Sequence, residues 1–163
     1  MKTLASIFLL CLSIVCLSQE STTFILVRHS EKAKDGTKNP PLNDDGKSRS
    51  INLAEMLSNQ EINALYATPF KRTEETLQPI ADRTDLQIMS YDPYSKDEWL
   101  ESLLENHIGE TIVISGHSNT IPGLANSLLG EEKFQQFDDS DYSNLLIIVA
   151  DEIGKGKLVR LKF

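Results

Sequence analysis

The chain has 163 residues, a formal net charge of −8, three histidines and two cysteines. An acidic chain lacks the basic surface that nucleic acids and anionic membranes require, so we expect neither as a partner. If the ligand is itself an anion, the positive charge must be concentrated at one place.

Residues 1–18 have the pattern of a secretory signal peptide. A short basic start precedes the uncharged apolar run Leu4 to Leu17, and small residues stand at −3 and −1 before Gln19. The run is shorter than the roughly 20 residues that span a bilayer, which disfavours an uncleaved anchor. A lipid on Cys16 is a further alternative, disfavoured by Val15 before it. We therefore expect an exported protein, periplasmic or extracellular, without stable membrane insertion.

Cleavage would remove both cysteines and one lysine, changing the net charge from −8 to −9. The remaining residues 19–163 would have no disulfide, and they are enough for one domain with its own core. We see no repeat and no linker.

The predicted elements alternate between strands and helices. Phe24 to Val27 is an apolar run typical of a strand covered on both faces. The Asn43 side chain is expected to cap the next helix, and Gly46 to permit close packing. The further strands are expected at 63–67, 86–91, 111–115, 144–150 and 158–163, and the further helices at 69–83, 96–106 and 121–129. The pattern predicts an α/β fold with three layers, a mostly parallel sheet flanked by helices, and an antiparallel C-terminal finish. In the last strand Val159, Leu161 and Phe163 alternate with basic residues, which predicts one wet face.

Three predicted strands end in groups that can hold an anion: Arg28-His29, the segment from Thr68 to Arg72, and Gly116-His117-Ser118. Parallel strands present their carboxyl ends at one edge, where ligands bind. Thr68 is expected to cap the second helix, with Pro69 as its first residue. Lys71 and Arg72 would then oppose the helix dipole, unless an anion binds there. Lys71 can alternatively pair with a neighbouring surface glutamate.

Val27-Arg28-His29-Ser30-Glu31 resembles the Arg-His-Gly motif of the histidine phosphatase superfamily, which includes the phosphoglycerate mutases. Three more segments resemble that family in order and spacing: Pro41 to Gly46 with Leu53-Ala54, Ala67 to Thr73, and Val113 to Ser118. The resemblance covers about Thr23 to Leu129. Ser30 stands where the family usually has glycine, a small change.

The resemblance implies that His29 is a nucleophile that forms a phosphohistidine, without metal or cofactor. Arg28, Arg72 and His117, the last as an imidazolium, would hold the phosphoryl oxygens, and Ser118 or Asn119 would add a hydrogen bond. We therefore predict an exported phosphatase for a small phosphorylated substrate. His107, in a polar helix end, is expected outside the site.

The proton donor is the main departure from the family pattern, since Ser118 follows the second histidine where some members have an aspartate. By position Asp92 is the first candidate, with Glu31 and Asp35 behind it. Asp92 as a solvated turn residue is the alternative. Without a good acid the enzyme would be restricted to easy leaving groups, such as phosphoramidates or acyl phosphates.

Among phosphatases, a phosphohistidine or phosphoramidate phosphatase is similar in size, although such enzymes act in the cytoplasm. Members of the family that remove phosphate from envelope sugars fit the predicted export better, and the short loops disfavour a mutase.

Two other classes of function stay open. One is a non-catalytic phosphate-binding module. The other is a metal hydrolase with His29 and His117 as ligands, which is disfavoured because the usual ligand spacing is missing.

Overall fold

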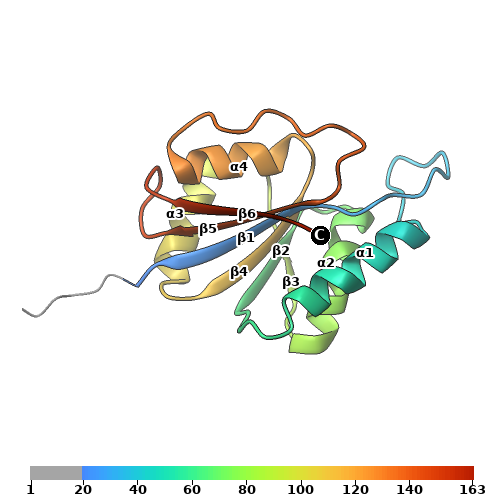
Figure 1. The fold of residues 1–163 in the computed structure, drawn as a ribbon, viewed down its shortest axis with the longest axis horizontal. Coiled ribbons are helices and arrows are strands. Elements are labelled where there is room, and N and C mark those ends of the chain that lie inside the picture. The colour runs from blue at the N-terminus through green and yellow to red at the C-terminus, as the bar shows by residue number, and fades with distance from the viewer. Residues whose placement is uncertain (1–19) are drawn as a thin grey trace, which may run out of the picture.

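The computed structural model describes residues 20–163, which form a six-stranded sheet with helices on both faces (Figure 1). The predicted signal peptide lies outside the described residues. The strands are β1 (Thr22–Arg28), β2 (Ala64–Ala67), β3 (Ile88–Ser90), β4 (Thr111–Gly116), β5 (Asn144–Ala150) and β6 (Lys157–Lys162). The helices are α1 (Asp44–Met56), α2 (Lys71–Thr84), α3 (Lys96–Asn106) and α4 (Thr120–Leu129).

The strand order is β3-β2-β4-β1-β5-β6. The first four strands are parallel, β5 runs antiparallel to β1, and β6 runs antiparallel to β5. The predicted three-layer α/β fold with an antiparallel finish is confirmed.

Strand β1 lies inside the sheet and is covered on both faces. Phe24 and Leu26 pack in one core, with residues of α3 and α4, while Ile25 and Val27 pack in the other, with residues of α1 and α2. In Figure 1 the two helix pairs lie on opposite sides of the sheet. An apolar run without polar alternation is therefore required at β1.

Helix α1 begins as predicted. The Asn43 side chain accepts a hydrogen bond from the amide of Gly46 at 2.8 Å. A Cβ atom at Gly46 would overlap the backbone of Glu31, so the glycine lets α1 approach the segment that follows His29. This contact fixes the position of that segment.

Helix α2 begins two residues later than predicted, at Lys71 with Phe70 as the N-cap residue. Thr68 is not its cap. The Thr68 hydroxyl instead contacts Thr73 at 3.1 Å and His117 at 2.9 Å, and these partners hold it away from the helix amides. Lys71 and Arg72 are nevertheless the first two residues of the helix.

The alternation in β6 predicts one wet face, but both faces of this edge strand are exposed: Val159 and Leu161 on one face, and Arg160 and Lys162 on the other. Among the residues that the structure describes, no helix is both long and apolar enough to cross a membrane.

Candidate active site

The carboxyl ends of β1, β2 and β4 meet in one pocket. Arg28 is paired with Gly116 in the sheet register, and the amide of His29 donates to the carbonyl of Gly116 at 2.9 Å. The ring centroids of His29 and His117 are 5.4 Å apart. The pocket has a volume of about 730 Å³ and is lined by the predicted residues Arg28, His29, Arg72, Asp92, His117, Ser118 and Asn119, together with Lys32, Pro69, Phe70, Ser90, Tyr91, Pro93, Tyr94, Thr120 and Asp139. Seven residues singled out from distant parts of the sequence thus share one cavity.

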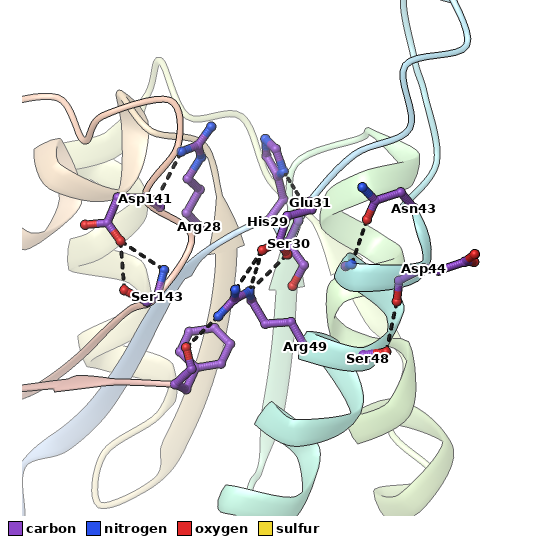
Figure 2. A network of polar contacts seen from close by, with 12 residues as sticks. Arg28, His29, Ser30, Glu31, Asn43, Asp44, Ser48, Arg49, Asp141 and Ser143 are labelled. Carbon is purple, nitrogen blue, oxygen red and sulfur yellow. Dashed lines mark hydrogen bonds and ion pairs between the residues drawn. The ribbon is translucent and has the colours of Figure 1, made fainter.

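The His29 ring is held with one nitrogen available to a ligand. Its Nδ1 lies 2.8 Å from the carbonyl oxygen of Ser30, as Figure 2 shows. A carbonyl only accepts, so Nδ1 carries the proton and Nε2 carries a lone pair. Burial lowers the pKa of His29 to about 3, against the opposing effect of the Ser30 bond and with help from the charges of Arg72 and Arg28. At neutral pH the ring is therefore uncharged, with the Nε2 lone pair free.

Arg28 is 4% exposed and is held by the segment that precedes β5. Its Nη1 donates to the carbonyl oxygens of Asp138 at 2.8 Å and Asp141 at 3.1 Å. Its guanidinium carbon lies 4.1 Å from the centroid of the Tyr142 ring, and its Nη2 lies 3.7 Å from the Asp139 carboxylate. These contacts fix the guanidinium at the pocket wall.

Arg72 reaches the pocket from the first turn of α2. Its guanidinium carbon lies 4.5 Å from the centroid of the Phe70 ring, and its Nη2 is 3.5 Å from Nδ1 of His117. Burial and the charge of Arg28 lower the pKa of Arg72. The Nε groups of both arginines are buried without a hydrogen-bond partner in the structure. Two neighbouring cations with unpaired donors are a site at which a bound anion relieves both repulsion and desolvation.

A chain of hydroxyl groups orients His117. The Thr73 hydroxyl donates to backbone carbonyls, including the carbonyl of Thr68 at 2.7 Å. Because its proton is used there, the Thr73 oxygen accepts a hydrogen bond from the Thr68 hydroxyl. The Thr68 oxygen is then left to accept from Nε2 of His117 at 2.9 Å. This order places the proton on Nε2 and turns the Nδ1 lone pair toward Arg72.

His117 is neutral in the free site, whereas the expected imidazolium concerns the site with a phosphoryl group bound. Burial lowers its pKa to about 4, with further contributions from Arg72, Arg28 and Lys32. A phosphoryl dianion would favour the charged form, so protonation of this ring would accompany the binding of such an anion.

The three candidate proton donors have different surroundings. Asp92 lines the pocket and accepts from the amide of Tyr94 at 3.0 Å. Glu31 is bound by Arg49 at 2.7 Å, and Asp35 by the amide and hydroxyl of Thr37 at 2.9 and 2.8 Å. Neither Glu31 nor Asp35 lines the pocket, which leaves Asp92 as the candidate among the three.

His107 lies outside the pocket, as expected. It follows α3, and its ring contacts the Tyr66 hydroxyl at 2.8 Å and the Glu110 carboxylate at 2.6 Å. No cluster of three potential metal-ligating side chains occurs within residues 20–163.

Residues of the pocket and its support that no sequence pattern indicated include Phe70, Thr68 as a partner of His117, Tyr94 and Asp139. The last is brought to the pocket by the segment between α4 and β5, for which we predicted no element. Pairing of β1 with β5 carries this segment across the end of β1, and no local pattern signals that pairing.

Comparison with known proteins agrees with this geometry. Residues 24–93 match the model of the histidine phosphatase superfamily (branch 1), a segment that contains Arg28, His29, Arg72 and Asp92. Phosphoserine phosphatase 1 of Hydrogenobacter thermophilus is 34% identical over 74 residues, which are 42% of this chain. The match spans about a third (35%) of that relative's length.

Solved structures extend the likeness over most of the chain. The protein histidine phosphatase SixA, complexed with tungstate, has a TM-score of 0.71 at 19% identity, with 86% of this chain and 96% of that chain covered. The putative alpha-ribazole-5'-P phosphatase of Escherichia coli has a TM-score of 0.72 at 14% identity, with 88% and 97% covered. The solved structures thus share the fold of this chain, and the sequence match to the histidine phosphatase superfamily covers residues 24–93.

Proposed function

We propose that the protein is a phosphatase that hydrolyses a small phosphorylated substrate through a phosphohistidine on His29. The observation that carries this proposal is the neutral Nε2 of His29, which shares a pocket with two guanidinium groups whose Nε donors are unpaired. The superfamily match and the phosphatases named above support it.

In the first step Nε2 of His29 attacks phosphorus, and the bond from phosphorus to the leaving oxygen breaks. Nδ1 keeps its proton, and its hydrogen bond to the Ser30 carbonyl stabilises the positive charge that the ring acquires. Arg28, Arg72 and protonated His117 hold the phosphoryl oxygens, where charge is spread in the transition state. Ser118 lines the same wall and adds a hydrogen bond.

The leaving oxygen takes a proton from Asp92 in this proposal. In the second step a water attacks phosphorus and gives a proton to the Asp92 carboxylate, the bond to Nε2 breaks, and inorganic phosphate leaves. No metal or other cofactor takes part in either step.

The test of the nucleophile is His29→Ala. The variant should lose turnover of an aryl phosphate and the acid-labile phosphoenzyme, while its circular dichroism and thermal unfolding stay close to those of the wild type. Turnover that persists would overturn the role of His29, and activity that is lost with a chelator would overturn the metal-free mechanism.

A non-catalytic phosphate-binding module is the second candidate, because the Asp92 carboxylate already accepts a bond within its own turn. Binding of inorganic phosphate without any turnover, in a panel of aryl, alkyl and amide phosphates, would favour that module. Turnover of the amide phosphates alone would favour a phosphohistidine or phosphoramidate phosphatase.

We also propose export, with residues 1–18 as a cleaved signal peptide and residues 19–163 as the mature domain. The support is the sequence pattern alone. Mass measurement of the protein recovered from its native host should show a mature chain that begins near Gln19. Recovery of the uncleaved chain from the cytoplasm would overturn export.

A further inference from the structure

The pocket is far larger than a phosphoryl group needs. Of its volume of about 730 Å³, a phosphate ion fills only a small part. Besides the cationic and imidazole groups, its lining includes Pro69, Phe70, Tyr91, Pro93 and Tyr94. The cavity therefore joins an anion-binding cluster to an apolar and largely aromatic wall.

Tyr94 is the most exposed large apolar side chain that the structure describes, with 89% of its surface accessible. It lies in the turn between β3 and α3, and its amide is fixed by the Asp92 carboxylate at 3.0 Å. An aromatic ring exposed at the border of a pocket leaves apolar area in water, and a flat ligand can cover it. No protein group of the described chain does so.

The rest of the wall is rigid. Tyr91 is 5% exposed, and its ring stacks on Trp99 with centroids 4.2 Å apart and an interplanar angle of 3°. The Phe70 ring lies edge-on to His117, at a centroid distance of 5.1 Å, and beneath the Arg72 guanidinium. A substrate ring that enters here meets surfaces that lose little side-chain freedom on binding.

The surroundings of the candidate proton donor also favour a substrate with an aromatic leaving group. The one predicted acid in the pocket, Asp92, lies at the surface and accepts a turn hydrogen bond. A phenolate leaves without full protonation more readily than an alkoxide does, so an aryl ester makes less demand on this acid.

We propose that the pocket binds phosphate esters of aromatic alcohols, with the ring of the leaving group against Tyr94 and the neighbouring Pro93 and Phe70. This inference rests on the proposed function for its catalytic step and adds a substrate class to it. The phosphorus–oxygen bond breaks as His29 attacks, and the phenolate takes its proton from Asp92 or from water.

The experiment compares phenyl phosphate with 2-naphthyl phosphate, whose leaving groups are of similar basicity, so that the second ring chiefly tests binding. The wild type should favour the naphthyl ester in kcat/KM, and Tyr94→Ala should reduce that preference about three- to tenfold. Tyr94→Phe should keep it, because only the ring is needed. Ile108→Ala, at an exposed apolar residue outside the pocket, is the matched control and should keep it too.

Calorimetric titration of both esters and inorganic phosphate into His29→Ala, with and without Tyr94→Ala, separates binding from chemistry. Naphthyl phosphate should bind more tightly than inorganic phosphate, and Tyr94→Ala should weaken only the former. The aromatic subsite would be overturned if Tyr94→Ala kept the full preference for the naphthyl ester, or if naphthyl phosphate and inorganic phosphate bound equally tightly. Absence of turnover of every ester by the wild type would instead overturn the proposed function, while the titration still decides the subsite.

Discussion

At the scale of single residues, the fold keeps both imidazole rings of the free pocket uncharged. Each ring has one nitrogen committed to a fixed protein group, the Ser30 carbonyl for His29 and the Thr68 hydroxyl for His117. The tautomers are therefore opposite. His29 presents Nε2 to the pocket, and His117 presents Nδ1.

The first prediction concerns stability against pH. The pKa of His29 falls from 6.5 in the unfolded chain to about 3 in the folded one. Below pH 6.5 the unfolded chain binds the extra proton, so the free energy of unfolding is highest above pH 6.5 and falls as the pH falls toward 3. When the pH is lowered from 7 to 5, the free energy of unfolding of His29→Asn should fall by about 2 kcal/mol less than that of the wild type. Urea unfolding in phosphate-free buffer measures both values. Equal losses in the two proteins would contradict a buried neutral His29.

The second prediction concerns Thr68. Thr68→Val keeps the shape of the side chain but removes the acceptor for Nε2 of His117, so kcat/KM should fall about tenfold. Thr68→Ser keeps the hydroxyl and should remain within about twofold of the wild type. Steady-state kinetics on an aryl phosphate tests both, and equal losses in the two variants would show that the methyl group matters rather than the hydroxyl.

The third prediction concerns Asp92. Asp92→Asn removes the proposed donor, and the loss of kcat should be about a hundredfold for an alkyl phosphate and much smaller for an aryl phosphate. Asp35→Asn is a matched control, since Asp35 is also an exposed carboxylate that accepts an amide two residues later. Equal losses on the two esters would remove Asp92 as the acid.

At the scale of the elements, the start of α2 carries two cations at the expense of helix stability. Lys71 and Arg72 are its first two residues, and cations there oppose the helix dipole. Arg72 also lies close enough to Arg28 for the charge of Arg28 to lower its pKa. A phosphate at this place removes both penalties.

The fourth prediction follows from that arrangement. In phosphate-free buffer Arg72→Gln should raise the free energy of unfolding by about 0.5 kcal/mol, because a cation at the positive helix end is removed. The same variant should lose the stabilisation that inorganic phosphate gives the wild type. Thermal unfolding with and without phosphate measures both effects. Lys71→Gln is the matched control, since Lys71 is exposed and outside the pocket; it should keep the phosphate effect. Loss of that effect in both variants would assign it to the helix end rather than to Arg72.

At the scale of the whole molecule, one arginine connects three distant parts of the chain close to His29. Arg49 of α1 donates to both carboxylate oxygens of Glu31, with Nη2 to Oε1 at 2.7 Å, and to the Phe163 carbonyl at 2.5 Å (Figure 2). Glu31 follows His29 by two residues. The segment after His29 is thus held by α1 and, through Arg49, is connected to Phe163, which follows β6.

The fifth prediction is that Arg49→Leu lowers the free energy of unfolding by about 2 kcal/mol, because Glu31 then stays half-buried without its partner. Lys47→Ala, which removes only an exposed ion pair with Asp44, should change it by less than about 0.5 kcal/mol. Urea unfolding compares the two variants. A loss no larger in Arg49→Leu than in Lys47→Ala would contradict this role.

The sequence by itself determined the order and type of the elements, because hydrophobic periodicity and capping residues act over a few neighbouring positions. Strand β5 and helix α3 begin and end as predicted, and Asn43 caps α1. Arg28, His29, Arg72 and His117 could also be singled out, since each follows a predicted strand end and parallel strands share that edge.

The tertiary structure decided what depends on contacts between distant segments. Only the packing of β2 against β4 turns Thr68 from a helix cap into the partner of His117, and only burial makes both imidazoles neutral. The edge position of β6 left Val159 exposed, which alternation along one strand does not reveal. The aromatic wall likewise comes from separate turns. Its side chains meet only because the sheet brings the ends of β2 and β3 to one pocket. Local sequence does not encode how close these two strand ends lie.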